Sequence, residues 1–193
     1  MIEYLDGKIV ELNPAHAIVD VGGVGYFITI SLNTYSALTR TKSGKLFIHE
    51  VIREDAHNLY GFSEPDERVL FRNLISVSGI GPNTGILFLS SLSVIEIKSA
   101  IVSGDFNKLK TIKGVGLKTA QRLVVELKDK LGKEPLPSDI FSTENNTTRE
   151  EALSALVTLG FVKKNAEKII DTILKQNPQD TVEQLIKDAL KQI

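Results

Sequence analysis

Two short glycine motifs in the middle of the chain have the residue types and spacing of a phosphate-binding site. The sequences GIG (79–81) and GVG (114–116) lie 35 positions apart, and a helix-forming stretch follows each of them directly. Glycine permits a tight turn with positive φ, and without a side chain it lets a phosphate approach main-chain N–H groups closely. The positive end of the following helix strengthens that attraction. The motifs therefore predict contacts with the backbone of a nucleic acid.

The two glycine motifs belong to an internal repeat. LFRNLISVSGIGPNTGILFLSSL (70–92) aligns with DFNKLKTIKGVGLKTAQRLVVEL (105–127), so that Phe71 matches Phe106, Leu74 matches Leu109 and Val77 matches Ile112. Each copy reads as an amphipathic stretch, a Gly-x-Gly hairpin and a second amphipathic stretch. Two such units side by side can hold both strands of a duplex. Because the contacts would go to the backbone, binding should be largely independent of base sequence and should weaken with salt.

Hydrogen-bond donors surround both hairpins. Lys113, Lys118 and Arg122 bracket the second turn, whereas the first copy has the neutral donors Asn83 and Thr84, so we expect the second hairpin to bind phosphate more strongly. A plain corner between helices is the alternative for either turn alone, and the repetition favours DNA binding. The complete predicted set is Gly79, Gly81, Asn83, Thr84, Lys113, Gly114, Gly116, Lys118, Thr119 and Arg122.

Charge is unevenly distributed along the chain. The net charge of −1 over 193 residues argues against a nucleic-acid binder, but residues 63–133 carry 11 basic and 7 acidic groups. Residues 1–62 carry 5 basic and 7 acidic groups, and residues 134–193 carry 7 and 10. The positive excess therefore coincides with the repeated hairpins, where phosphate attraction is useful.

Composition excludes several classes of protein. There is no cysteine, which rules out disulfides, Cys-based zinc sites and thiol nucleophiles. The N-terminus lacks the apolar core of a signal peptide, and no apolar run approaches a membrane span. We therefore expect a cytoplasmic protein without a membrane segment.

No catalytic, metal or cofactor site is predicted. His16, His49 and His57 lack metal-ligand spacing, and neither a Ser-His-Asp set nor a carboxylate cluster for two-metal chemistry is evident. The stretch from Gly114 to Thr119 superficially resembles a phosphate loop. It lacks the glycine before the lysine and follows a helix instead of a strand, so ATP binding is excluded.

The elements that must position these residues predict a multidomain α+β protein. Residues 1–63 are rich in β-branched and aromatic runs and indicate a small barrel, with an OB-type barrel the leading option. Residues 64–132 are helical, and residues 133–147 have the prolines and polar residues of a flexible linker. Residues 148–193 predict a bundle of three short helices.

Helix starts are predicted from capping boxes, in which Ser or Thr precedes Glu or Gln by a few residues. Three such pairs are proposed, at Ser63 with Glu67, Thr148 with Glu151, and Thr181 with Gln184.

An acidic pair, Glu54 and Asp55, follows a predicted strand and the cation Arg53. Taken alone, such a pair is usually solvated surface. Beside DNA, the same pair would repel phosphates and could keep strands apart.

Over its whole length the sequence resembles the RuvA family, the Holliday-junction-binding subunits of bacterial branch-migration machines. The most specific motifs are GGVGY (22–26), REDAHNLYGF (53–62), GIGPNTG (79–85), GVGLKTAQRLVVELKDK (114–130) and ALVTLGF (155–161). The resemblance implies an OB-type barrel, a tandem helix-hairpin-helix domain and a mobile three-helix domain.

The resemblance also implies partners and site roles. It implies a homotetramer that holds a four-way junction open, with an octamer when two tetramers sandwich the DNA. Glu54 and Asp55 match the family's acidic pin, which promotes strand separation. The third domain would contact RuvB, a hexameric ATPase, with Leu159 and Phe161 as candidate contacts or as packing residues of the bundle; a RuvC-type resolvase is a further candidate partner. Asn83 and Leu117 stand where lysine is frequent in the family. This departure concerns the side-chain contacts at these positions and leaves the implied backbone contacts unchanged.

Two other classes of function are alternatives. A DNA-repair enzyme with paired hairpins, such as a glycosylase, would carry a catalytic aspartate shortly after the hairpin, but Glu126 and Asp129 lie within a helix. A protein-interaction scaffold would show no salt-dependent DNA binding.

Overall fold

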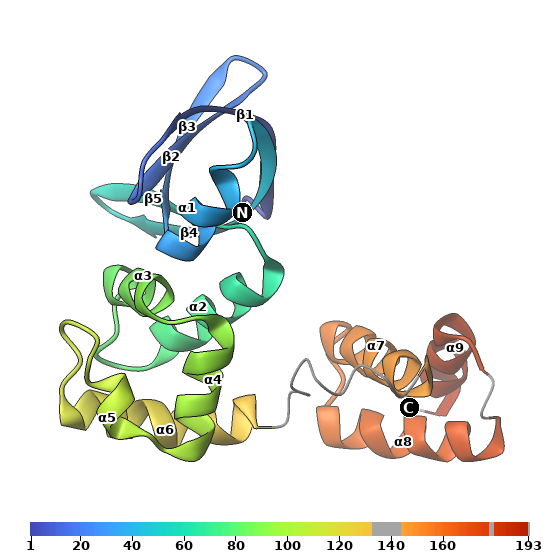
Figure 1. Cartoon of the computed structure of the whole chain (residues 1–193). Helices are drawn as coiled ribbons and strands as arrows, with labels where there is room; N and C mark the ends of the chain where they lie inside the picture. The colour runs from blue at the N-terminus through green and yellow to red at the C-terminus, as the bar shows by residue number, and fades with distance from the viewer. Residues whose placement is uncertain (133–143, 178–179, 193) are drawn as a thin grey trace. The chain divides into compact units, whose positions relative to one another are not determined.

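The computed structural model describes residues 1–132, 144–177 and 180–192 (Figure 1). The chain divides into two compact units, residues 1–134 and residues 135–193. Among the described residues, the first unit contains a five-stranded barrel and six helices, and the second contains three helices.

The barrel has the strand order and crossover helix of an OB-fold. It closes in the order β1-β2-β3-β5-β4, with β3 and β5 parallel and the other neighbours antiparallel. Helix α1 (Leu32–Leu38) lies between β3 and β4 in the chain. The strands are β1 (Tyr4–Leu12), β2 (His16–Val21), β3 (Val24–Ile30), β4 (Ser43–Arg53) and β5 (Ala56–Phe62). The predicted OB-type barrel is therefore confirmed.

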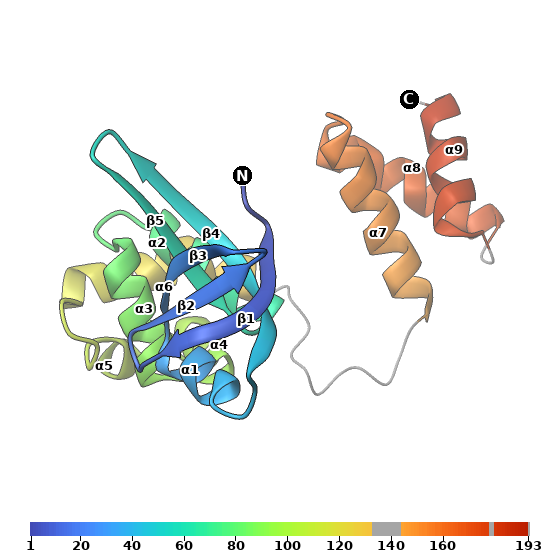
Figure 2. The same ribbon diagram turned by 90° about the horizontal axis from the view of Figure 1, so that it is seen from above.

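Alternation along the strands forms the barrel core. Ala17 and Val19 on β2 and Ile28 and Ile30 on β3 are almost completely buried, and the residues between them are more exposed. This follows because successive side chains of a strand point to opposite faces. The longest hairpin joins β4 to β5, and it extends beyond the rest of the barrel (Figure 2).

In the helical part of the first unit, matching residues of the two repeat copies are buried in the same way. Leu74 and Leu109 are fully buried at matching positions, as are Val77 and Ile112. The helices are α2 (Pro65–Ser76), α3 (Pro82–Ser91), α4 (Val94–Ser103), α5 (Phe106–Leu109) and α6 (Leu117–Leu131). The copies differ in one respect, since α2 has three turns and α5 has only one. Gly104 ends α4 in the left-handed conformation just before α5 begins, so little chain remains for a longer helix.

The predicted capping box at Ser63 and Glu67 is wrong. The N-cap of α2 is Glu64, whose side chain makes no capping hydrogen bond, and Glu67 lies buried in the first turn. Its carboxylate accepts hydrogen bonds from the hydroxyls of Ser31 and Thr34, the latter at 2.7 Å. The carboxylate in this first turn therefore accepts mainly from side chains at the start of α1, and not from a Ser63 capping box.

A capping box that was not among the three predicted starts α4 at Ser93. The side chain of Glu96 accepts from the Ser93 backbone N–H, and the Ser93 hydroxyl accepts from the Glu96 backbone N–H. Hydrogen bonds from the Ser93 backbone and hydroxyl, together with Lys108, lower the pKa of Glu96 to about 2. The S-x-x-E sequence at 93–96 is the signal that identifies it.

The second unit packs three helices around a small apolar core. The helices are α7 (Glu144–Thr158), α8 (Lys163–Gln176) and α9 (Val182–Gln192), and the buried residues are Ala152, Leu156, Ala166, Ile170, Ile173, Leu185 and Ala189.

The capping box of Thr181 and Gln184 is confirmed by its two hydrogen bonds at 3.1 and 3.4 Å. The one at Thr148 is wrong, because α7 begins four residues earlier at Glu144. Most of the predicted linker, residues 133–143, lies outside the described residues.

In the described part of the chain, no single helix combines the length and the hydropathy of a membrane span. Only α3 and α4 taken together meet that test, and the chain bends by 103° between them.

Candidate nucleic-acid interface

The two glycine hairpins have nearly the same backbone. Gly79 and Gly114 adopt φ of +96° and +88°, in the left-handed region that favours glycine. Gly81 and Gly116 adopt φ of −86° and −84° with extended ψ, and they are the N-caps of α3 and α6. The two glycine motifs that repeat in the sequence therefore also share one backbone conformation.

The middle residue anchors each hairpin while its glycines stay exposed. Ile80 and Val115 are 4% and 6% exposed and pack into the helical core. Their backbone N–H groups donate to Val77 and Ile112 at 3.0 Å, which closes the same turn in both copies. A Cβ added at Gly81, Gly114 or Gly116 would meet nothing within 4 Å. Both hairpins thus present bare main chain to solvent.

The helices that follow the hairpins begin without a side-chain cap. No side chain accepts a hydrogen bond from the first N–H groups of α3 or α6 in the described residues, and Pro82 takes the first helical turn of α3. The intrahelical bonds begin at Gly85 and Ala120, which donate to Gly81 and Gly116. The preceding N–H groups of both helices are therefore oriented to receive an anion.

Arg122 links the two hairpins. Its guanidinium donates to the carbonyl of Ser78 at 3.2 Å and forms an ion pair with Glu126 at 3.8 Å. A Cβ at Gly79 would lie 3.8 Å from the Thr119 hydroxyl, so the first turn lies beside the start of α6. The predicted site residues of the two copies are thus brought together, and Arg122 also has a structural role.

Close packing of α2 against α3 depends on Gly85. A Cβ there would come within 2.9 Å of the Phe71 ring and 3.1 Å of Ile75. The absence of a side chain lets α3 lie against α2, and this contact holds the first hairpin in place.

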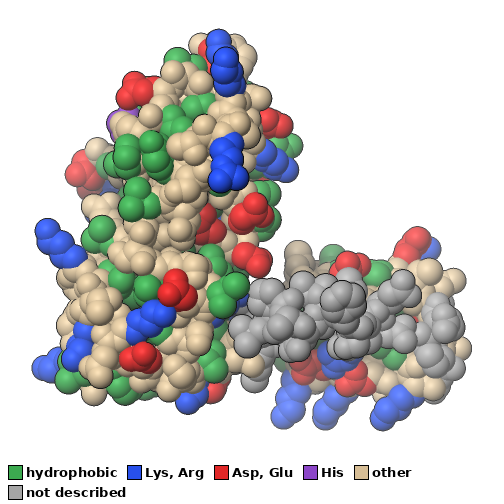
Figure 3. All heavy atoms as spheres, viewed as in Figure 1, with side chains coloured by type: hydrophobic (Ala, Val, Ile, Leu, Met, Phe, Trp, Pro, Cys, Tyr) green, Lys and Arg blue, Asp and Glu red, His purple; other side chains and the backbone are tan. Residues whose placement is uncertain are grey.

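Basic side chains gather near the second hairpin. Lys110, Lys113 and Lys118 are exposed, and Lys and Arg side chains lie along the lower left edge of the first unit, over α5 and α6 (Figure 3). Asn83 is exposed beside the first hairpin, and Leu117 is 50% exposed beside the second. The stronger positive charge therefore lies at the second hairpin.

The acidic pair occupies the tip of the β4–β5 hairpin. Glu54 and Asp55 form its two-residue turn and are exposed. Arg53, the last residue of β4, is also exposed and pairs across the hairpin with Ala56. The turn therefore carries two negative charges directly beside one positive charge.

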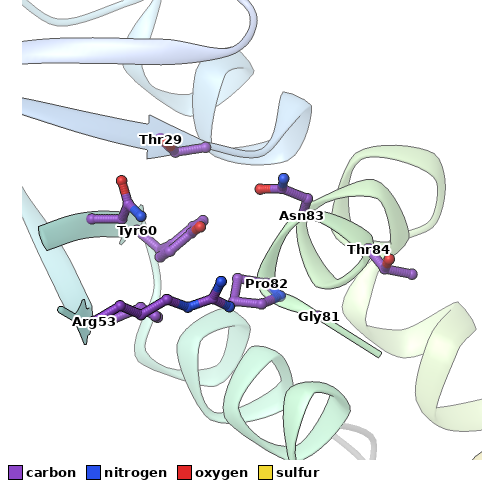
Figure 4. A pocket seen from close by; sticks show the side chains of 9 residues that line it. Thr29, Arg53, Tyr60, Gly81, Pro82, Asn83 and Thr84 are labelled. Atoms are coloured by element: carbon purple, nitrogen blue, oxygen red, sulfur yellow. The ribbon is translucent and has the colours of Figure 1, made fainter. Parts of the chain in front are cut away.

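Several barrel residues outside the predicted DNA-binding set face the first hairpin. Thr29, Asn58 and Tyr60 line a groove with Arg53 on one side, and Asn83 lies on the other (Figure 4). Burial raises the pKa of Tyr60, and the charge of Arg53 lowers it by less. The motif REDAHNLYGF contains three of these residues, but it does not indicate that they lie opposite the glycine hairpin.

In the second unit, the two candidate partner residues have different environments. Leu159 is 61% exposed and lines a shallow apolar groove with Ala155 and Ile186. Phe161 packs against the bundle core, and its backbone N–H donates to Leu156 at 3.1 Å. Leu159 is therefore the more accessible of the two.

Family models match all three parts of the chain. The RuvA N terminal domain matches residues 1–61, a SAM-like helix-hairpin-helix tandem matches residues 71–129, and the RuvA C-terminal domain matches residues 147–193. The second model includes both glycine hairpins.

Proteins named Holliday junction branch migration complex subunit RuvA align over the full chain. The protein of Parabacteroides distasonis is 50% identical over 198 residues, and that of Flavobacterium psychrophilum is 47% identical over 193 residues. The protein of Christiangramia forsetii is 44% identical over 193 residues, and each alignment covers 100% of both chains. With the barrel, the paired hairpins and the small helical unit in the same order, the chain belongs to the RuvA family.

Proposed function

We propose that the chain is a non-catalytic subunit that binds four-way junction DNA and presents it to a RuvB-type ATPase for branch migration in the cytoplasm. The observation that carries the proposal is the pair of hairpins with one backbone conformation, exposed glycines and uncapped helix starts. Two such sites held together by Arg122 suit the two backbones of one duplex arm. ATP hydrolysis belongs to the partner.

A homotetramer would place four copies of this site around one crossover, and an octamer would add four more from the opposite side of the junction. Each copy would hold one arm, and the four acidic turns would meet where strands exchange. The exposed Leu159 in the second unit would contact the ATPase through its apolar groove. A RuvC-type resolvase would act on the same junction.

The proposal predicts a preference for branched DNA. We expect affinity for an immobile four-way junction to exceed that for linear duplex of equal length by about 100-fold or more, since several phosphate sites engage together. Fluorescence anisotropy at several salt concentrations measures both affinities. Equal affinities would contradict the proposal, and mass measurement of the complex gives the number of subunits.

If Glu54 and Asp55 act by repelling phosphates, removing their charges should affect strand opening at the crossover but should not weaken junction binding. In the variant Glu54→Gln with Asp55→Asn, we expect junction affinity to stay unchanged or rise up to about 10-fold, because repulsion of phosphates is removed. Strand separation at the crossover, followed by 2-aminopurine fluorescence, should fall.

The control variant removes the same charge from another exposed part of the barrel, with Asp6→Asn and Glu11→Gln. It should leave 2-aminopurine fluorescence at the value of the original protein. If strand separation is undiminished in Glu54→Gln with Asp55→Asn, the acidic turn does not separate the strands.

A further inference from the structure

A groove of about 380 Å³ separates the barrel from the first glycine hairpin within the first unit. Its barrel side comes from the ends of β3 and β4 and the middle of β5, and its other side is the start of α3 (Figure 4). The lining residues are Thr29, Val51, Arg53, Asn58, Tyr60, Gly81, Pro82, Asn83 and Thr84. In Figure 4 the Asn83 side chain points toward the barrel, whereas Thr84 points away from it.

The chemistry of the lining fits an anion. Arg53 contributes a cation, Asn58 and Asn83 contribute amide donors, and Tyr60 contributes a hydroxyl. None of the nine lining residues is Asp or Glu, although Glu54 and Asp55 directly follow Arg53 in the chain. The uncapped start of α3 adds a partial positive charge at the same groove.

Arg53 has no ion-pair partner among the described residues. Arg68, Arg72, Arg122 and Arg149 each form an ion pair with a carboxylate. Arg53 and Arg40 form none there, and both side chains are exposed. The charge of Arg53 is therefore available to a ligand in the groove.

Tyr60 lines the groove and packs against the helical core. The centroid of its ring lies 5.3 Å from that of Phe71, and the residue is 6% exposed. The ordinary pKa of a tyrosine hydroxyl lies well above neutral pH and burial raises it further, so the group is protonated and can donate a hydrogen bond.

We propose that this groove binds a phosphodiester of the junction strand that passes between the acidic turn and the first hairpin. The inference rests on the proposed function and adds Arg53, Tyr60 and Asn58 to the DNA-binding residues. Arg53 attracts the phosphate at the groove, and Glu54 and Asp55 repel the backbone beyond it. The opposite charges of neighbouring residues thus set the path of the strand near the crossover.

The test compares Arg53→Gln with Arg40→Gln, which removes the other unpaired arginine from the barrel. Without its charge-assisted bond to the phosphate, Arg53→Gln should bind the junction about 10-fold or more weakly. The slope of log K against log salt should fall by about 0.9 for each phosphate that the variant no longer neutralises. Arg40→Gln should match the original protein in both respects. Thermal unfolding followed by circular dichroism shows that each variant is folded.

A chemical probe identifies the phosphate itself. Junctions that carry one neutral methylphosphonate at successive positions near the crossover are titrated with both proteins. At one position the substitution should weaken binding of the original protein by about 10-fold and leave Arg53→Gln unaffected, since that variant has no cation to pair with the phosphate.

The outcomes separate the groove from the proposed function. If the original protein prefers junctions and Arg53→Gln keeps its affinity and salt slope, the groove proposal is overturned while junction binding stands. A loss of equal size on linear duplex would also overturn it, because the phosphate would not belong to the crossover. A protein without junction preference would overturn both proposals.

Asn83→Asp tests the groove from its other side. The carboxylate suits the first turn of α3, so the fold should be retained, but it should repel a phosphate in the groove. We expect junction binding to weaken by about 10-fold, and unchanged binding would argue against an anion there.

Discussion

Aspartate at the N-caps of both hairpin helices, in the variant Gly81→Asp with Gly116→Asp, should abolish tight junction binding while the fold is retained. Both glycines have the extended conformation that any N-cap residue adopts, and a Cβ at either position meets open space. Aspartate is a favoured N-cap residue, and since glycine is only slightly worse there, each helix should gain roughly a few tenths of a kcal/mol. The same carboxylates would occupy the place of the phosphates and repel them.

We expect junction affinity to fall by about 100-fold or more, because both phosphate sites of each arm are removed. Anisotropy titration gives the affinity, and urea unfolding gives the free energy of unfolding. The matched control is Gly81→Asn with Gly116→Asn, which has the same shape and capping ability without the charge. It should bind markedly better than the aspartate variant. Binding of the aspartate variant at the original affinity would show that the helix starts do not contact DNA.

Removal of the buried carboxylate in Glu67→Ala should destabilise the first unit by about 2–4 kcal/mol. The Ser31 hydroxyl accepts from the backbone N–H of Thr34 and donates to Glu67. The Thr34 hydroxyl accepts from the backbone N–H of Ser63 and also donates to Glu67. Without Glu67, two buried hydroxyls lose their acceptor at the contact between α1 and α2. Urea unfolding at neutral pH measures the change.

The pH dependence of stability distinguishes the charge of Glu67 from its packing. Burial raises the pKa of Glu67 above 4.5, and the hydrogen bonds from Ser31 and Thr34 oppose that rise without cancelling it. The folded state therefore binds the proton more tightly than the unfolded state. The part of the stability that comes from binding this proton is full below pH 4.5 and is lost as the pH rises through the folded pKa, whereas the hydrogen bonds from Ser31 and Thr34 do not depend on it.

Glu67→Gln is the matched control, because it keeps the size of the side chain and removes the titration. Relative to the original protein, its free energy of unfolding should improve as the pH rises from about 4 to about 8. A difference that is constant over this range would show that Glu67 has the same pKa in both states.

Features set by local conformation could be predicted from the sequence alone. The glycines at positions 79 and 114 adopt positive φ, and the residues between each glycine pair are buried, as a repeated turn requires. The OB-type barrel followed from alternating strands and turn residues, because a strand with one buried face has a period of two. The capping box at Thr181 formed because its partners are neighbours in the chain.

Features that depend on distant segments were decided by the tertiary structure. Glu67, in the first turn of α2, accepts from the buried hydroxyls of Ser31 and Thr34 at the start of α1, and Arg122 reaches a carbonyl of the other hairpin. The groove brings Arg53 and Tyr60 beside Asn83 only because β4 and β5 pack near the start of α3. Local propensity determines which turns and strands form, whereas burial and charge pairing between distant segments determine which side chains remain available to DNA.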